Sequence, residues 1–155
     1  PEILFLDEPT LGLDVEIARD VRDYLKKWIK EGQNERTVLL TTHYMQEADE
    51  LCEKIGIIND GRLILEGTSS EIKSTSPYNA KYIITTTDDC KLEIESFKLK
   101  TKQLSYNEYE LYVEKAIDES ALYKYLSTNK KILTFEKHLP TLEDAFVSLT
   151  GRNLR

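Results

Sequence analysis

Short apolar runs and one long helical stripe alternate along residues 1–42. Residues 3–6 are four consecutive apolar residues, and residues 37–42 form a second run rich in β-branched side chains. Each run predicts a strand, and the uninterrupted first run is typical of a strand buried on both faces. Between them, apolar residues recur at helical spacing from Ile17 to Ile29, which predicts an amphipathic helix that ends at Gly32. Residues 3–42 should therefore form a strand-helix-strand unit with parallel strands.

The pattern after residue 42 predicts shorter elements. A helix is expected over residues 45–52, with an acidic face that we expect to be solvated, formed by Glu47, Asp49, Glu50 and Glu53. A hairpin should follow, with strands at 54–58 and 62–65 around an Asp-Gly turn. Thr68 and Glu71 have capping-box spacing for a brief helix, and residues 74–77 have the composition of a linker.

The pattern of residues 78–155 predicts a separate α+β unit with helices on one face of a small antiparallel sheet. Strands are expected at 81–86, 100–104, 110–114 and 132–136, helices at 120–126 and from 142 onward, and an unassigned stretch at 89–97. Thr141 should cap the last helix, with Asp144 at its N3 position. Tyrosines alternate with charged residues along these strands, which favours a packing role over base stacking.

Composition narrows the class of protein. The chain has 155 residues, of which 40% are hydrophobic and 32% charged, as in a folded soluble protein. Its apolar runs are too short to cross a bilayer, and no signal-peptide pattern opens the chain. The net charge of -7 argues against a nucleic-acid partner. Cys52 and Cys90 lack metal-site or disulfide-framework spacing, which favours a reducing cytosol.

Polar residues with chemical potential follow both strands of the first unit. Asp7 and Glu8 come directly after the first strand, and His43 follows the second. The carboxyl ends of parallel strands share one edge of a sheet, where ligands bind in α/β proteins. Hydrolysis of a nucleoside triphosphate needs a metal, a group that orients water and donors for the developing charge. Asp7 could hold Mg²⁺ through a water, Glu8 could polarise the attacking water, and His43 could hydrogen-bond the γ-phosphate.

These residues carry a resemblance to a known family. Residues 3–8 resemble the Walker B strand of the ATP-binding subunit of ABC transporters, Pro9 to Asp14 its D-loop, and Thr41-Thr42-His43 its switch-histidine loop. The similarity continues through residue 73. Residues 139–146 and 149–151 are similar to the accessory C-terminal domain of the drug-resistance and antibiotic-export branch. The resemblance implies the C-terminal half of a P-loop NTPase core at residues 1–73, a linker at 74–77 and an accessory α+β domain at 78–155.

In that family, two subunits sandwich two ATP molecules with Mg²⁺ beneath transmembrane permease subunits. The resemblance therefore implies a second ATP-binding subunit, in a homodimer, and permeases as partners, with the protein at the cytoplasmic face of the membrane. It also implies that Asp14 contributes to nucleotide binding across the subunit interface. The chain has no phosphate loop, signature motif or glutamine loop, and it begins without Met. We therefore expect a fragment of a longer protein that is inactive alone. Its unpaired strands and exposed apolar faces should make it self-associate or pack against its C-terminal unit.

Two other functions remain open at this point. ABC-type ATPases that act on DNA or ribosomes share the strand and the loop, but a coiled-coil neighbour or a basic linker would be expected there. Residues 78–155 could also act as a non-enzymatic regulatory or dimerisation module. Binding of a small molecule to that unit would favour a sensor, and self-association would favour a structural role.

Overall fold

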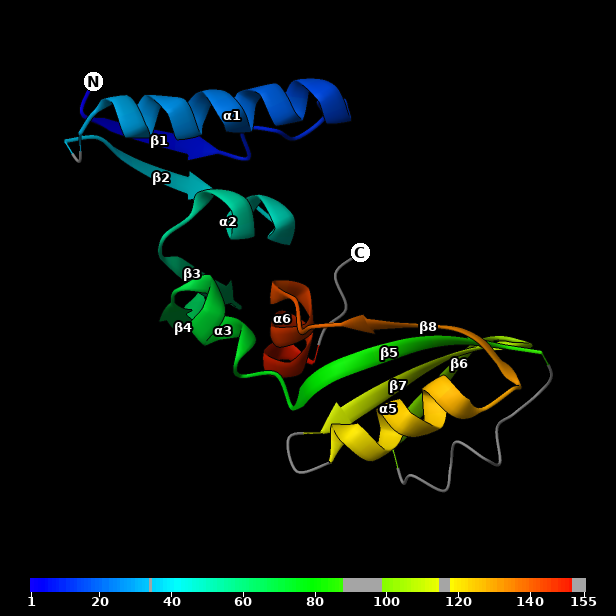
Figure 1. The fold of residues 1–155 in the computed structure, drawn as a ribbon. Coiled ribbons are helices and arrows are strands. Elements are labelled where there is room, and N and C mark those ends of the chain that lie inside the picture. The colour runs from blue at the N-terminus through cyan, green and yellow to red at the C-terminus, as the bar shows by residue number, and fades with distance from the viewer. Residues whose placement is uncertain (34, 88–98, 115–117, 152–155) are drawn as a thin grey trace. The chain divides into compact units, whose positions relative to one another are not determined.

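The computed structural model describes residues 1–33, 35–87, 99–114 and 118–151 (Figure 1). The chain is a mixed α/β structure that divides into two compact units, Pro1–Ile72 and Lys73–Arg155. The unassigned stretch at 89–97 lies outside the described residues.

The first unit contains the expected strand-helix-strand arrangement. Strands β1 (Ile3–Asp7) and β2 (Thr37–Thr41) pair in parallel, and helix α1 (Val15–Glu31) connects them. The Asp14 carboxylate caps α1 by accepting from the backbone N–H groups of Glu16 and Ile17, at 3.1 and 2.9 Å. The remaining elements also follow the predictions and are α2 (Met45–Leu51), β3 (Ile55–Asn59), β4 (Arg62–Gly67) and α3 (Ser69–Lys73).

The burial of the β1–β2 pair differs from the expectation of two covered faces. Ile3, Phe5 and Leu39 are 55%, 74% and 58% exposed, whereas the residues between them are half-buried. Successive side chains of a strand point to opposite faces, and α1 runs along the two-stranded sheet (Figure 1). The other face is an exposed apolar surface within the described residues, as the expectation of unpaired strands implies. We call Ile3, Phe5 and Leu39 the exposed sheet face.

The prediction that Glu47 belongs to a solvated acidic face of α2 is wrong. Glu47 is only 2% exposed, and within the described residues neither of its carboxylate oxygens has a hydrogen-bond partner. Asp49 and Glu50 do lie on the surface, where Asp49 accepts from the Ser69 hydroxyl and Glu50 pairs with Arg22 at 3.1 Å. Because α2 is only seven residues long, its sequence is too short for periodicity to show which side faces inward.

The second unit is built on a four-stranded antiparallel sheet with the order β6-β7-β5-β8. Its strands are β5 (Tyr78–Thr86), β6 (Lys100–Ser105), β7 (Glu108–Glu114) and β8 (Ile132–His138), and its helices are α5 (Glu119–Thr128) and α6 (Leu142–Thr150). The strands contribute Tyr82 and Tyr109 to the core, and α5 contributes Leu122 and Leu126. Burial of these two tyrosines agrees with the predicted packing role.

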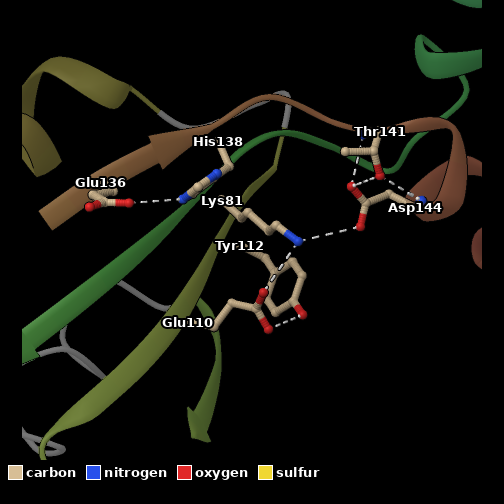
Figure 2. A network of polar contacts seen from close by, with 7 residues as sticks. All are labelled: Lys81, Glu110, Tyr112, Glu136, His138, Thr141 and Asp144. Atoms are coloured by element: carbon tan, nitrogen blue, oxygen red, sulfur yellow. Dashed lines mark hydrogen bonds and ion pairs between the residues drawn. The ribbon is translucent and has the colours of Figure 1, made fainter. Parts of the chain in front are cut away.

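A polar network connects α6 to the sheet (Figure 2). Lys81 Nζ lies 3.4 Å from Glu110 Oε1 and 3.6 Å from Asp144 Oδ1. The Tyr112 hydroxyl donates to Glu110 Oε2 at 2.6 Å. Asp144 also accepts from the Thr141 backbone N–H at 2.8 Å and donates its own N–H to the Thr141 hydroxyl, which confirms the predicted cap. Lys81 therefore compensates two carboxylates that would otherwise repel each other in a partly buried place.

Candidate functional site

The carboxyl ends of β1 and β2 are held in a fixed register. Asp7 lies opposite Thr41, and the Thr41 hydroxyl donates a hydrogen bond to Asp7 Oδ1. The Glu8 backbone N–H donates to the Thr41 carbonyl oxygen at 2.9 Å, which extends the pairing one residue beyond β1. Asp7 and Glu8 therefore emerge side by side with the residues that follow β2.

Glu8 and His43 are in direct contact at this edge. Glu8 Oε2 lies 2.9 Å from His43 Nδ1 and also accepts from the His43 backbone N–H at 3.4 Å. The Glu8 side chain is 28% exposed and the His43 side chain 50% exposed, so both groups can reach a ligand from solvent. An ionised carboxylate can only accept, so Nδ1 donates the proton in this contact. In the neutral imidazole, Nε2 is then the unprotonated nitrogen.

The backbone at Glu8 has an uncommon conformation. Its φ is +47°, a left-handed value that is unfavourable for a residue with a Cβ atom. The chain turns immediately after β1, because the Glu8 carbonyl accepts from the Leu11 N–H at 3.0 Å. Gly12, in the same loop, has a φ of +77°, as expected for a glycine at this point. Backbone strain of this kind is often found at functional positions, so it supports a role for the Glu8 carboxylate.

Asp7 has the donor chemistry that Mg²⁺ requires. Mg²⁺ is usually bound by one or two carboxylates together with waters and substrate phosphates. Within the described residues, no group of three or more His, Cys, Asp or Glu side chains could hold a metal alone. The Asp7 carboxylate, oriented by Thr41, is a ligand of this kind, and its role in holding Mg²⁺ stays a prediction.

Asp14 is the one predicted site residue whose described contacts are purely local. Its Oδ1 accepts both hydrogen bonds of the α1 cap. In the part of the chain that the structure describes, no hydrogen bond or ion pair connects Asp14 with Asp7, Glu8 or His43. The role of Asp14 in nucleotide binding stays a prediction.

The structure also shows features of this site that the sequence reasoning missed. Thr41 was noted as part of a loop, but its contact with Asp7 was not predicted. The runs seen in the sequence, 3–6 and 37–42, differ in length, so only the observed register shows that Asp7 lies opposite Thr41. The positive φ of Glu8 had no signal in the sequence either, since glutamate has no preference for such a conformation.

Comparison with known proteins identifies the family. No protein-family model matches the chain. Its curated homologues are ATP-binding proteins of ABC transporters of the drug-resistance and export type. The chain therefore belongs among the ABC transporter ATP-binding proteins.

Three relatives illustrate the similarity. The daunorubicin/doxorubicin resistance ATP-binding protein of Streptomyces peucetius is 32% identical over 97% of the chain and 47% of the relative. A fluoroquinolones export ATP-binding protein of Mycobacterium tuberculosis is 32% identical over 99% of the chain and 45% of its own length. The linearmycin resistance ATP-binding protein of Bacillus subtilis is 29% identical over 100% of the chain and 51% of its length.

The chain thus spans about half the length of the curated relatives that it matches. Across the described residues, none of the helices combines the length and the hydropathy needed to cross a bilayer.

Proposed function

We propose that this chain supplies the Walker B, D-loop and switch-histidine part of the ATP-binding subunit of an ABC exporter. The observation that carries the proposal is the contact between Glu8 Oε2 and His43 Nδ1 beside Asp7, at the carboxyl edge of a parallel strand pair. Similarity to resistance and export proteins along almost the whole chain supports the same function.

In this proposal, each residue has a distinct role. Asp7, oriented by Thr41, contributes a carboxylate to Mg²⁺, and the metal ion neutralises phosphate charge when it is bound. Glu8 accepts a hydrogen bond from the attacking water and polarises it. Glu8 holds His43 through Nδ1, which leaves Nε2 for contact with a ligand. When Nε2 carries a proton, it donates a hydrogen bond to the γ-phosphate. Asp14 orders the start of α1 and places the D-loop for contact with the second subunit.

The proposed function also implies which subunits this protein assembles with. A second ATP-binding subunit completes each nucleotide site, and transmembrane permease subunits hold the protein at the cytoplasmic face of the membrane. Residues 1–73 form part of the nucleotide-binding core in this proposal, and residues 78–155 form an accessory domain. Since the sequence contains no phosphate-binding loop with its lysine, we propose that the 155 residues do not hydrolyse ATP alone.

A chimera tests the catalytic assignment. The half of the Streptomyces peucetius relative that has no counterpart here would be joined to residues 1–155, and Mg-ATP turnover would be measured. We expect activity in the chimera and a loss of about 100-fold or more in Glu8→Gln, the usual size of a general-base contribution. Glu53→Gln, which changes an exposed acid beyond α2, is the matched control and should retain activity.

Two results would contradict the proposal. One is an active chimera in which Glu8→Gln and Glu53→Gln behave alike. The other is Mg-ATP turnover by the purified 155-residue chain that disappears in Glu8→Gln, which would show that these residues are a sufficient enzyme.

A further inference from the structure

The second unit contains a hollow that the proposed ATPase function does not use. It has a volume of about 470 Å³, within the usual range for small-molecule sites, and is formed by β5, α5 and β8. We call it the aromatic hollow and define it by six of its lining residues, Tyr82, Glu119, Tyr123, Lys124, Phe135 and Lys137.

Three rings form the apolar part of the aromatic hollow. Tyr123 meets Phe135 edge to face, with ring centroids 5.6 Å apart, and Tyr82 lies 6.4 Å from Phe135 at a tilt of 45°. Tyr82 is only 2% exposed and is fixed in the core, whereas Tyr123 is 55% exposed and can cover a ligand. Offset and edge-to-face contacts of this kind are the arrangements that aromatic rings prefer. The shape and chemistry of the walls therefore suit a planar aromatic group.

The charged side chains around the aromatic hollow determine which sign of charge a ligand should carry. The Glu119 carboxylate accepts from the Tyr82 hydroxyl at 3.3 Å and pairs with Lys137 Nζ at 2.8 Å. Lys137 therefore already neutralises the charge of the Glu119 carboxylate. Within the described residues, no carboxylate lies within ion-pair distance of Lys124 Nζ. Among the described residues of this rim, Lys124 is thus a lysine without an ion pair, and its positive charge favours an anion and disfavours a cation.

We propose that the aromatic hollow binds a small planar aromatic acid. Its ring packs among Tyr82, Tyr123 and Phe135, and its carboxylate pairs with Lys124. The residues involved lie entirely within the second unit, so binding at this site does not depend on the ATPase chemistry.

The test is a titration of the isotope-labelled 155-residue chain by NMR with salicylate, a planar aromatic carboxylate. Benzylamine serves as the cationic probe, and N-acetylphenylalaninamide as a neutral mimic of an aromatic side chain from a partner protein. We expect saturable shifts at Tyr123, Lys124 and Phe135 with salicylate, and binding weaker by about 5-fold or more with the other two probes.

Two variants and two matched controls locate the binding. Tyr123→Ala should weaken salicylate binding about tenfold, and Lys124→Gln about 2- to 5-fold, the range expected for an exposed charge. Tyr106→Ala and Lys130→Gln change an exposed tyrosine and an exposed lysine outside the hollow and should leave the affinity unchanged. All four positions are exposed, so these variants should fold normally.

Several outcomes would overturn the proposal. The first is that no probe gives saturable shifts at the aromatic hollow. The second is that benzylamine binds as tightly as salicylate, and the third is that the neutral amide does so. The fourth is that Lys130→Gln weakens binding as much as Lys124→Gln, which would indicate a nonspecific charge effect. None of these readouts involves ATP, so a failure here leaves the proposed ATPase function unaffected.

Discussion

Glu8 Oε2 lies 2.9 Å from His43 Nδ1, although the two residues are 35 positions apart in the sequence. The contact exists because β1 and β2 are parallel and end at the same edge, with Asp7 opposite Thr41. It fixes the ring of His43 relative to the backbone of both strands, since Glu8 Oε2 also accepts from the His43 N–H.

The contact predicts the tautomer of His43. Because a carboxylate only accepts hydrogen bonds, neutral His43 should carry its proton on Nδ1. Long-range ¹⁵N–¹H NMR spectra at a pH where the ring is neutral should show Nδ1 protonated and Nε2 unprotonated. Glu8→Ala should shift the ring toward the Nε2–H form, whereas Glu53→Ala should not. An Nε2–H tautomer in the unaltered chain would contradict this geometry.

The left-handed backbone at Glu8 predicts an unusual order of stability. Glu8→Ala and Glu8→Gly remove the same carboxylate, but only glycine adopts a φ of +47° without strain. We expect the glycine variant to be more stable than the alanine variant by about 1 kcal/mol in urea unfolding. At an exposed position in the interior of α1, such as Asp23, the alanine and glycine variants should show the opposite order, since glycine costs about 1 kcal/mol in a helix interior. If Glu8→Ala were more stable than Glu8→Gly, the prediction of backbone strain at Glu8 would be wrong.

The exposed sheet face predicts self-association. Phe5 is 74% exposed beside Ile3 and Leu39, and apolar surface of this kind favours association with a second copy. Sedimentation velocity should show a concentration-dependent dimer or larger species, and Phe5→Glu should shift the population toward monomer. Leu133→Glu removes a side chain that is 60% exposed in the second unit and is the matched control. A strictly monomeric, folded chain at all concentrations would count against the prediction.

The network around Asp144 predicts a loss of stability in acid. Partial burial raises the pKa of Asp144, but hydrogen bonds from Tyr78 and Thr141 and the charge of Lys81 outweigh burial and hold it below its usual range. Because the pKa of Asp144 is lower in the folded than in the unfolded state, its ionised carboxylate stabilises the fold at pH values above the unfolded pKa of about 4. This stabilisation is lost as the pH falls through the pKa of the folded state.

Asp144→Asn should therefore be less stable than the unaltered chain near pH 7, and the difference should shrink as pH falls below about 4. Urea unfolding at a series of pH values measures it. Glu143→Gln, at the neighbouring position of α6, is the control and should not show this convergence. A gap between the unaltered chain and Asp144→Asn that stays constant with pH would contradict the role of the network.

The surroundings of Tyr82 predict that the fold loses stability in alkali. Burial, followed by the nearby Glu119 carboxylate, raises the pKa of Tyr82 to about 12. In the unfolded chain the phenol ionises near pH 10. The contribution of the Tyr82 phenol to the stability of the fold is therefore present below about pH 10 and is lost as pH rises toward 12.

The free energy of unfolding should therefore fall between about pH 10 and 12, and it should fall less steeply in Tyr82→Phe. Absorbance at about 295 nm, where phenolate absorbs, would follow the ionisation. Tyr106→Phe alters an exposed ring and should have the slope of the unaltered chain. Identical slopes for all three proteins would show that Tyr82 is not protected by the fold.

Much of the local structure could be predicted because its causes are local. The apolar stripe of α1, the Asp-Gly turn between β3 and β4 and the Thr141 cap each depend on residues within a few positions of one another. The meeting of Glu8 and His43 was also within reach, because parallel strands bring their carboxyl ends to one edge.

Burial could not be predicted in the same way. The apolar run of residues 3–6 is typical of a doubly covered strand, but whether both faces are covered depends on what packs against them. Glu47 is buried because of the orientation of a helix too short to reveal it in sequence. A charge pattern shows which residues prefer water, and only the fold decides which of them have access to it.

The sequence by itself determined the order of the elements, the chemical identity of Asp7, Glu8 and His43 and the resemblance to ABC transporter ATP-binding proteins, because motifs and periodicity are properties of the chain. Only the tertiary structure decided that Thr41 orients Asp7 and that Tyr82, Tyr123 and Phe135 surround one hollow. The physical reason is that these relationships join residues from different elements, and their distances are set by packing between elements rather than by local conformational preference.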